Sequence, residues 1–268
     1  MREQVEGFRK ECNALAELLE SLEDRDFEIV TQFKQWTIGD VLRHLHVWNY
    51  AADRALMAPQ EFDAYLAAFA EHAASGDVRV FERHWCREPA GRGLLDAWRA
   101  LASELCVHFA SADPKVRVRW VGPDMSARSA ITARLMETWA HGQEVYDILG
   151  VERGTDDRIK DIAFLGVRTF EWTFRNRGLA VPGKRPYVRL QAPSGAVWEF
   201  GDPDEENRIE GNAVEFCQVV TQVRNVADTS LEVRGEVARR WMAIAQCFAG
   251  PPSDPPAPGT RFRVTRRG

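Results

Sequence analysis

One pattern governs the first 177 residues: apolar side chains recur at alternating steps of three and four residues. This spacing places them on one face of an α-helix, which must bury that face against another element. Several such helices in succession pack by their apolar faces into a bundle. We predict four bundle helices and a fifth helix after them, over residues 3–22, 38–57, 94–109, 125–149 and 156–177.

The connection between the second and third predicted helices, residues 58–93, is less regular. Its apolar residues indicate only one short helix, around residues 65–70, before a glycine ends the pattern. A connection of this length inside a bundle is typically either a lid over a site or an addition without a role. The sequence leaves both interpretations open.

The chain changes character at residues 178–186, where two glycines and two prolines interrupt the helical pattern. We place the domain boundary there, with a helical bundle over 1–180. Short alternating runs then predict strands near 187–190, 196–200, 207–211 and 230–233, with helices over 212–223 and 236–248. Residues 181–250 are therefore expected to form a small α/β domain, and the proline-rich residues 251–268 a disordered tail. The predicted fold class is α+β.

Composition narrows the classes of function. A net charge of −5 argues against nucleic acid or an anionic membrane as the main partner. No apolar run approaches the ~18 residues of a membrane span, and the N-terminal residues are polar, unlike a signal peptide. The five cysteines include no Cys-x-x-Cys pair, which is typical of a reduced cytoplasmic protein and excludes a cysteine zinc cluster. We expect a cytoplasmic monomer or homodimer that acts on a small molecule.

The fourth predicted helix carries a carboxylate and an imidazole on a face that is otherwise small or apolar. Glu137 and His141 are four residues apart, so a helix stacks them on one side. A buried carboxylate and imidazole must be paired or must bind something. By spacing alone this is either a helix-surface pair, a core histidine with a satisfied partner, or part of a divalent-metal site.

The second predicted helix supplies a further imidazole. Thr37 and Asp40 form a capping-box pattern at its start. His44 falls on the apolar face, whereas His46 lies about 200° around the axis, with the polar side that we expect to face solvent. His44, Glu137 and His141 together would suit zinc with open coordination positions. Asp40 either orients the second ring nitrogen of His44 or is occupied by the helix cap.

Two segments resemble a known family. Residues 36–45 (WTIGDVLRHL) and 133–145 (ARLMETWAHGQEV) resemble the paired helix signatures of DinB-like proteins, and especially of the mycothiol-dependent maleylpyruvate isomerase group. The resemblance implies a DinB-like four-helix bundle in which His44, Glu137 and His141 bind a divalent metal, usually zinc. It also implies that Arg224 of the second domain assists at the active site and holds a substrate or cofactor carboxylate.

The same resemblance implies a reaction. A low-molecular-weight thiol, mycothiol or another, would attack a small electrophilic substrate, and the product would be a cis–trans isomer or an S-conjugate. Two alternatives remain. One is a metal-dependent hydrolase that uses water as the nucleophile, with Glu144 as the candidate general base. The other is a non-catalytic metal-binding or ligand-binding protein.

Overall fold

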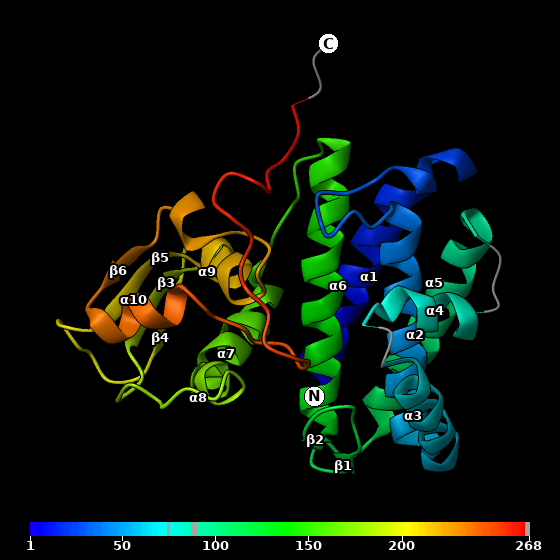
Figure 1. Cartoon of the computed structure of the whole chain (residues 1–268), viewed down its shortest axis with the longest axis horizontal. Coiled ribbons are helices and arrows are strands. Elements are labelled where there is room, and N and C mark those ends of the chain that lie inside the picture. The colour runs from blue at the N-terminus through cyan, green and yellow to red at the C-terminus, as the bar shows by residue number, and fades with distance from the viewer. Residues whose placement is uncertain (74–75, 87–89, 266–268) are drawn as a thin grey trace. The chain divides into compact units, whose positions relative to one another are not determined.

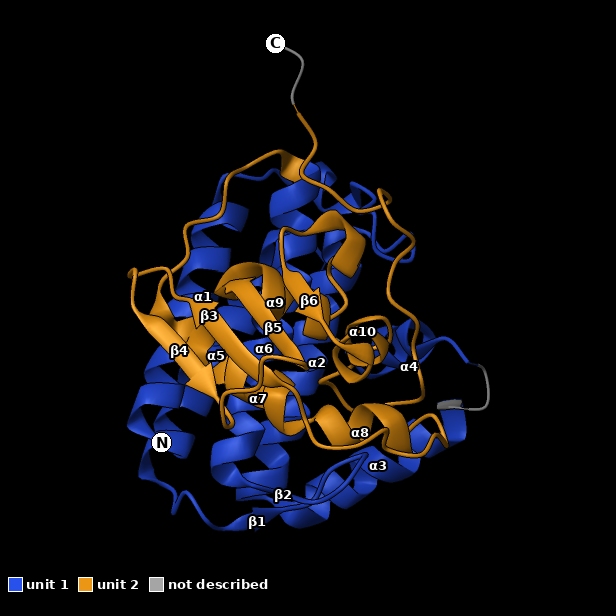
Figure 2. Ribbon diagram, turned by 90° about the vertical axis from the view of Figure 1, so that its left-hand side faces the viewer, with its two compact units in different colours: residues 1–148 blue, residues 149–268 orange. Residues whose placement is uncertain are grey.

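The structure is a computed structural model, and it describes residues 1–73, 76–86 and 90–265. The chain divides into two compact units, residues 1–148 and 149–268 (Figure 2). The boundary lies about 30 residues before the predicted one near residue 180. The reason is that the fifth predicted helix packs with elements of the second unit, where Lys160–Arg168 lies against Ala213–Val220.

The first unit is a helical bundle (Figure 1). Its four long helices are α1 (Arg2–Glu20), α2 (Ile38–Met57), α5 (Arg92–Ser111) and α6 (Ala127–Leu149). A 3₁₀ turn, η1 (Asp24–Glu28), follows α1, and a two-stranded ribbon of β1 (Arg117–Val118) and β2 (Met125–Ser126) precedes α6. The α5 helix packs along both α1 and α2. These four helices confirm the predicted ones to within a few residues at each end.

The 58–93 connection is more ordered than its sequence suggests. It contains two helices, α3 (Pro59–Ala73) and α4 (Val78–Trp85), in place of one short helix. Both pack against α2 and against each other. Phe62, Tyr65 and Phe81 from these helices are fully buried, so the segment adds a second layer of aromatic core beside α2.

The second unit is a four-stranded mixed sheet with helices. The strands are β3 (Tyr187–Gln191), β4 (Val197–Phe200), β5 (Arg208–Asn212) and β6 (Glu232–Arg234), in the order β4-β3-β5-β6. The two central strands are parallel, and each edge strand is antiparallel to its neighbour. The helices are α7 (Lys160–Arg168), α8 (Phe170–Arg175), α9 (Ala213–Val220) and α10 (Glu236–Met242), with 3₁₀ turns η2 (Asp157–Ile159) and η3 (Val226–Asp228).

Local chemistry explains two details of the second unit. Gly166 of α7 lets α9 approach closely, because a Cβ atom there would lie 2.7 Å from a methyl group of Val220. The fifth predicted helix is interrupted at Thr169, whose hydroxyl donates to the carbonyls of Leu165 and Gly166. Such back-bonding competes with regular helical geometry.

The last described residues are held in place, unlike the disordered tail that composition predicts. Arg177 Nη1 lies 2.8 Å from Asp254 Oδ1, Asn225 donates to the carbonyl of Pro256 at 2.8 Å, and the amide of Gly259 donates to Asp228. Prolines remove donors from the segment, but the Pro256 carbonyl, the Gly259 amide and the Asp254 carboxylate find partners elsewhere in the second unit.

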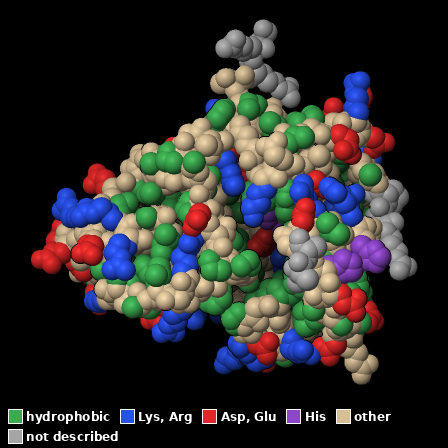
Figure 3. Space-filling view, viewed as in Figure 1, with side chains coloured by type: hydrophobic (Ala, Val, Ile, Leu, Met, Phe, Trp, Pro, Cys, Tyr) green, Lys and Arg blue, Asp and Glu red, His purple; other side chains and the backbone are tan. Residues whose placement is uncertain are grey.

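Surface charge and helix hydropathy bear on the kinds of partner that the chain can bind. On the face that Figure 3 shows, Lys and Arg side chains are interspersed with Asp and Glu and form no broad basic patch. Within the described ranges, the structure contains no helix that is both long and apolar enough to span a membrane.

Candidate metal centre

The three residues singled out by the sequence come together in the bundle. One ligand atom from each of His44, Glu137 and His141 lies within 4.8 Å of those from the other two. Glu137 Oε2 is 3.5 Å from His44 Nε2 and 3.3 Å from His141 Nε2. Their side chains are 13%, 20% and 14% exposed, so the cluster is sheltered but reachable from solvent.

Helix starts and spacing position these side chains. The N-cap Thr37 accepts the amide of Asp40 at 3.0 Å, while Asp40 accepts the amide of Thr37 at 3.3 Å. This reciprocal box fixes the first turn of α2, and His44 follows one turn after Asp40. Glu137 and His141 are one turn apart on α6, which stacks them on one side of that helix.

The donor set fits a divalent metal. Zinc bonds to imidazole nitrogen and carboxylate oxygen are ~2.0–2.2 Å, so two ligand atoms of a tetrahedral site lie about 3.4 Å apart. The two measured separations from Glu137, 3.3 and 3.5 Å, match this spacing. Two imidazoles and one carboxylate are also the ligand types that leave a coordination position open for substrate.

Glu82 of α4 completes the surroundings of His44, and sequence reasoning missed it. Its Oε1 lies 2.6 Å from His44 Nδ1 and accepts the indole N–H of Trp48 at 2.9 Å. The carboxylate is only 1% exposed. A hydrogen bond from Nδ1 leaves Nε2 as the nitrogen with a free lone pair, which is the arrangement of a metal-binding histidine.

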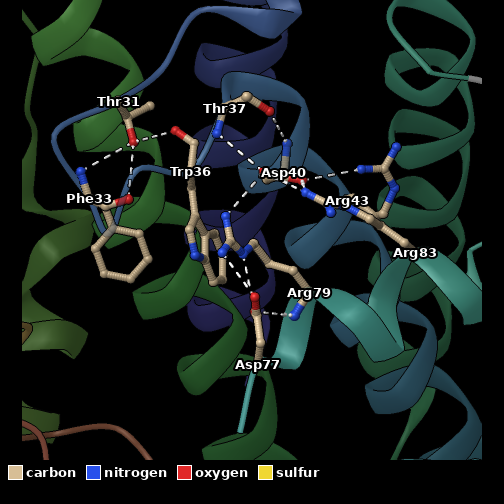
Figure 4. A network of polar contacts seen from close by, with 9 residues as sticks. All are labelled: Thr31, Phe33, Trp36, Thr37, Asp40, Arg43, Asp77, Arg79 and Arg83. Atoms are coloured by element: carbon tan, nitrogen blue, oxygen red, sulfur yellow. Dashed lines mark hydrogen bonds and ion pairs between the residues drawn. The ribbon is translucent and has the colours of Figure 1, made fainter. Parts of the chain in front are cut away.

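Asp40 does not orient His44, so of the two roles considered for it the helix cap is the observed one. Besides the cap, its carboxylate faces three guanidinium groups (Figure 4). Arg83 donates to it at 2.9 Å, and Arg43 and Arg79 lie 3.6 and 3.7 Å away. Asp40 therefore ties α4 to the start of α2, on the side of α4 that also presents Glu82.

Aromatic rings wall the cluster. The ring of Trp36 lies parallel to that of His141, with an interplanar angle of 1° and centroids 5.9 Å apart. Phe33 meets the same imidazole edge-on at 5.1 Å. Arg79 lies over Trp36, with its guanidinium carbon 5.9 Å from the ring centroid (Figure 4). These contacts restrict the rotation of His141 and limit the access of water.

Electrostatics favours a charged carboxylate between the imidazoles. Burial opposes the charge of Glu137, but hydrogen bonds from His141 and His44 hold its pKa well below the usual value. Burial alone would lower the pKa of His44, yet Glu82 and Glu137 outweigh it and raise that pKa to about 9. Burial, followed by the nearby His44, lowers the pKa of His141. In the metal-free protein His44 thus carries the proton that a metal would displace.

Comparison with known proteins places this geometry in a family. Residues 8–146, just over half of the chain, match the family described as mycothiol maleylpyruvate isomerase N-terminal domain. The chain belongs to this family. The match includes α2 and most of α6, and therefore all three residues of the cluster.

The similarity of the chain to known proteins extends over both units. An uncharacterized protein of Mycobacterium tuberculosis, in strains CDC 1551 and H37Rv, is 36% identical over 248 residues, which is 92% of this chain and 96% of the relative. Crystal structures of the mycothiol-dependent maleylpyruvate isomerase and of a histidine-to-alanine variant align with TM-scores of 0.53 and 0.50. At 14% identity, over 81% of this chain and 87% of those chains, the likeness is one of fold and confirms the predicted α+β architecture.

One histidine assignment within this family bundle is wrong. His46, expected on the solvent side of α2, is 7% exposed, and Asn49 and Asp53 on the same side are fully buried. The polar side meets polar partners instead of water: Asn49 accepts from Arg134 of α6 at 3.1 Å, and Asp53 lies 2.7 Å from His108 Nδ1 of α5. The α2 helix is covered on several sides, which its own periodicity does not reveal.

Two further candidates lie outside the cluster. Glu144, considered as a general base, is buried on α6 but is not one of the three clustered ligands. Arg224 belongs to the second unit, where it follows α9, and its Nη1 donates to the carbonyl of Val223 at 3.1 Å. Its part in the active site stays a prediction of the family resemblance.

Proposed function

We propose that this chain is a divalent-metal-dependent enzyme that uses a low-molecular-weight thiol, mycothiol, to isomerise a small electrophilic substrate or to form an S-conjugate with it. The observation that carries the proposal is the convergence of His44, Glu137 and His141 at a sheltered but accessible point. Membership of the family, whose described name refers to mycothiol and maleylpyruvate, supports the choice of thiol and substrate class. The solved structures with the same fold are of a mycothiol-dependent maleylpyruvate isomerase.

The proposed metal is zinc, held by His44 Nε2, His141 Nε2 and one oxygen of Glu137. When bound, it would lower the pKa of a thiol placed beside it, so that the thiolate, which is the reactive form, is available near neutral pH. Glu82 keeps the His44 ring oriented for this role through the bond to Nδ1. Trp36 and Phe33 hold the His141 ring and shield the reacting atoms from water.

A cation is also needed, because maleylpyruvate-like substrates carry carboxylates. We propose Arg224 for this task, since a guanidinium binds a carboxylate through two parallel hydrogen bonds. This assignment rests on the family resemblance.

The test is turnover of maleylpyruvate by zinc-loaded protein, followed by absorbance, with mycothiol, glutathione or bacillithiol added in turn. We expect turnover that requires a thiol, is fastest with mycothiol, and is lost in Glu137→Gln. Turnover at the same rate without any thiol would contradict the proposal and favour hydrolysis by water. A protein that binds zinc but turns over none of these mixtures would leave the non-catalytic alternative standing.

A further inference from the structure

A buried arginine lies one helical turn before the metal ligand Glu137. Arg134 of α6 is 3% exposed. Its Nε donates to the side-chain carbonyl of Asn49 at 3.1 Å. Its Nη2 atom is buried without a hydrogen-bond partner in the part of the chain that the structure describes, and the same holds for Asn49 Nδ2.

Arg134 also has no close counter-ion. Among the described residues, no carboxylate lies within ion-pair distance of its guanidinium, although a buried charge is normally paired. Burial lowers the pKa of Arg134, and the charge that opposes this most strongly is that of Glu137. The other two groups that act on it, Tyr65 of α3 and Cys12 of α1, are neutral at physiological pH. The carboxylate that compensates the charge of Arg134 most strongly is therefore that of the proposed metal ligand Glu137.

The charged groups around the cluster do not balance once a divalent metal is bound. A divalent metal with neutral His44 and His141 brings two positive charges. Glu137 and Glu82 bring two negative charges, and both carboxylates lie against the imidazoles and raise the pKa of His44. Arg134 then adds one positive charge in a buried setting, where charge interactions are weakly screened. The centre lacks one negative charge.

We propose that Arg134 is a specificity-determining residue that makes the metal centre select a monoanionic ligand, such as a thiolate, over a neutral one of similar size. This inference rests on the proposed metal-dependent function and extends it. Arg134 acts through the field at the open coordination position and has no need to touch the ligand. Its bond to Asn49 of α2 holds the guanidinium in place.

The test compares an anionic with a neutral probe on cobalt-loaded protein, in which binding changes the visible absorption of the metal. Azide is the monoanion and imidazole the neutral ligand, and neither requires turnover. The variants are Arg134→Met, which removes the charge but keeps the bulk, and Arg134→Lys, which keeps the charge. The control is Arg128→Met, because Arg128 is an exposed arginine on the same helix.

We expect Arg134→Met to weaken azide binding about tenfold, the effect of removing one nearby opposite charge. Imidazole affinity should be unchanged, cobalt affinity should not fall, and Arg134→Lys should restore most of the azide affinity. Arg128→Met should match the wild type in all three. If Arg134→Met does not fold, Arg134→Gln, which keeps a donor for Asn49, replaces it.

Equal azide affinity in wild type and Arg134→Met, with cobalt bound to both, would overturn the inference alone. Parallel loss of azide and imidazole, or loss of cobalt itself, would also overturn it, since either would mark Arg134 as a structural residue. Absence of cobalt binding by the wild-type chain would overturn the proposed function together with this inference.

Discussion

Glu82 and Asp40 are two buried carboxylates near His44 with different partners. Glu82 contacts the His44 ring at 2.6 Å, whereas Asp40 contacts the backbone of Thr37 and the guanidinium of Arg83. The spacing along α2 makes Asp40 a candidate partner of His44, because Asp40 precedes His44 by one turn. Glu82 lies 38 residues beyond His44, and only the path of the chain through α3 and α4 brings it back. The clustering of His44, Glu137 and His141 could be predicted from the sequence, but the contact of Glu82 with His44 could not.

Replacing Glu82 should therefore weaken metal binding. We expect Glu82→Gln to reduce zinc affinity by roughly 10–100-fold, the usual cost of losing a carboxylate that orients a histidine ligand. Competition with a chromophoric chelator measures the affinity. Glu71→Gln, an exposed change on the neighbouring α3, is the matched control. An unchanged zinc affinity in Glu82→Gln would show that the bond to Nδ1 has no part in metal binding.

Elements with strong local signals appear where the sequence predicts them. The α2 helix begins after Thr37 because Thr37 and Asp40 form a capping box. The α4 helix has only eight residues, which is too short a stretch for periodicity to predict a helix. Contacts with α2 and α3 stabilise it, and its Arg79 and Arg83 meet Asp40. The burial of His46 likewise depends on which elements cover α2, and it cannot be predicted from the position of His46 around the helix.

Asp40 should stabilise the start of α2 without affecting the metal site. We expect Asp40→Ala to lower the free energy of unfolding by about 1–2 kcal/mol, the cost of a lost cap interaction. The ion pair with Arg83 should add little, because that arginine is 56% exposed. Chemical denaturation measures the change. Zinc affinity should stay at the wild-type value, unlike in Glu82→Gln, and a parallel loss of both would mean that Asp40 supports His44 after all.

The molecule as a whole consists of a bundle and a mixed α/β unit, as the change of pattern near residue 180 predicts in outline. The observed boundary at residues 148–149 could not be found from composition. The fifth helix is amphipathic, and its apolar face would look the same whether it packed on the bundle or on the second unit. The order of the final residues depends on partners such as Arg177 and Asp228, which lie far away in sequence.

For the second unit the prediction concerns Arg224. Arg224→Ala should keep zinc and the fold but lose at least ~10-fold in activity, or about 1.4 kcal/mol, a modest demand on one charge-assisted contact. Arg224→Lys should recover only part of the loss, because lysine lacks the planar fork. Steady-state kinetics on a substrate that the wild type turns over measures this. Wild-type rates in Arg224→Ala would confine the active site to the bundle.

The central claim is that His44, Glu137 and His141 bind one divalent metal, and elemental analysis of purified protein tests it most directly. We expect about one zinc per chain in the wild type, and a sharp loss in His44→Ala, Glu137→Ala and His141→Ala. The control His84→Ala, an exposed change on α4, should retain the metal. His46→Ala should retain it too, although the loss of a buried ring will lower stability. Full metal content in the three ligand variants, or loss of metal in His46→Ala alone, would contradict the account.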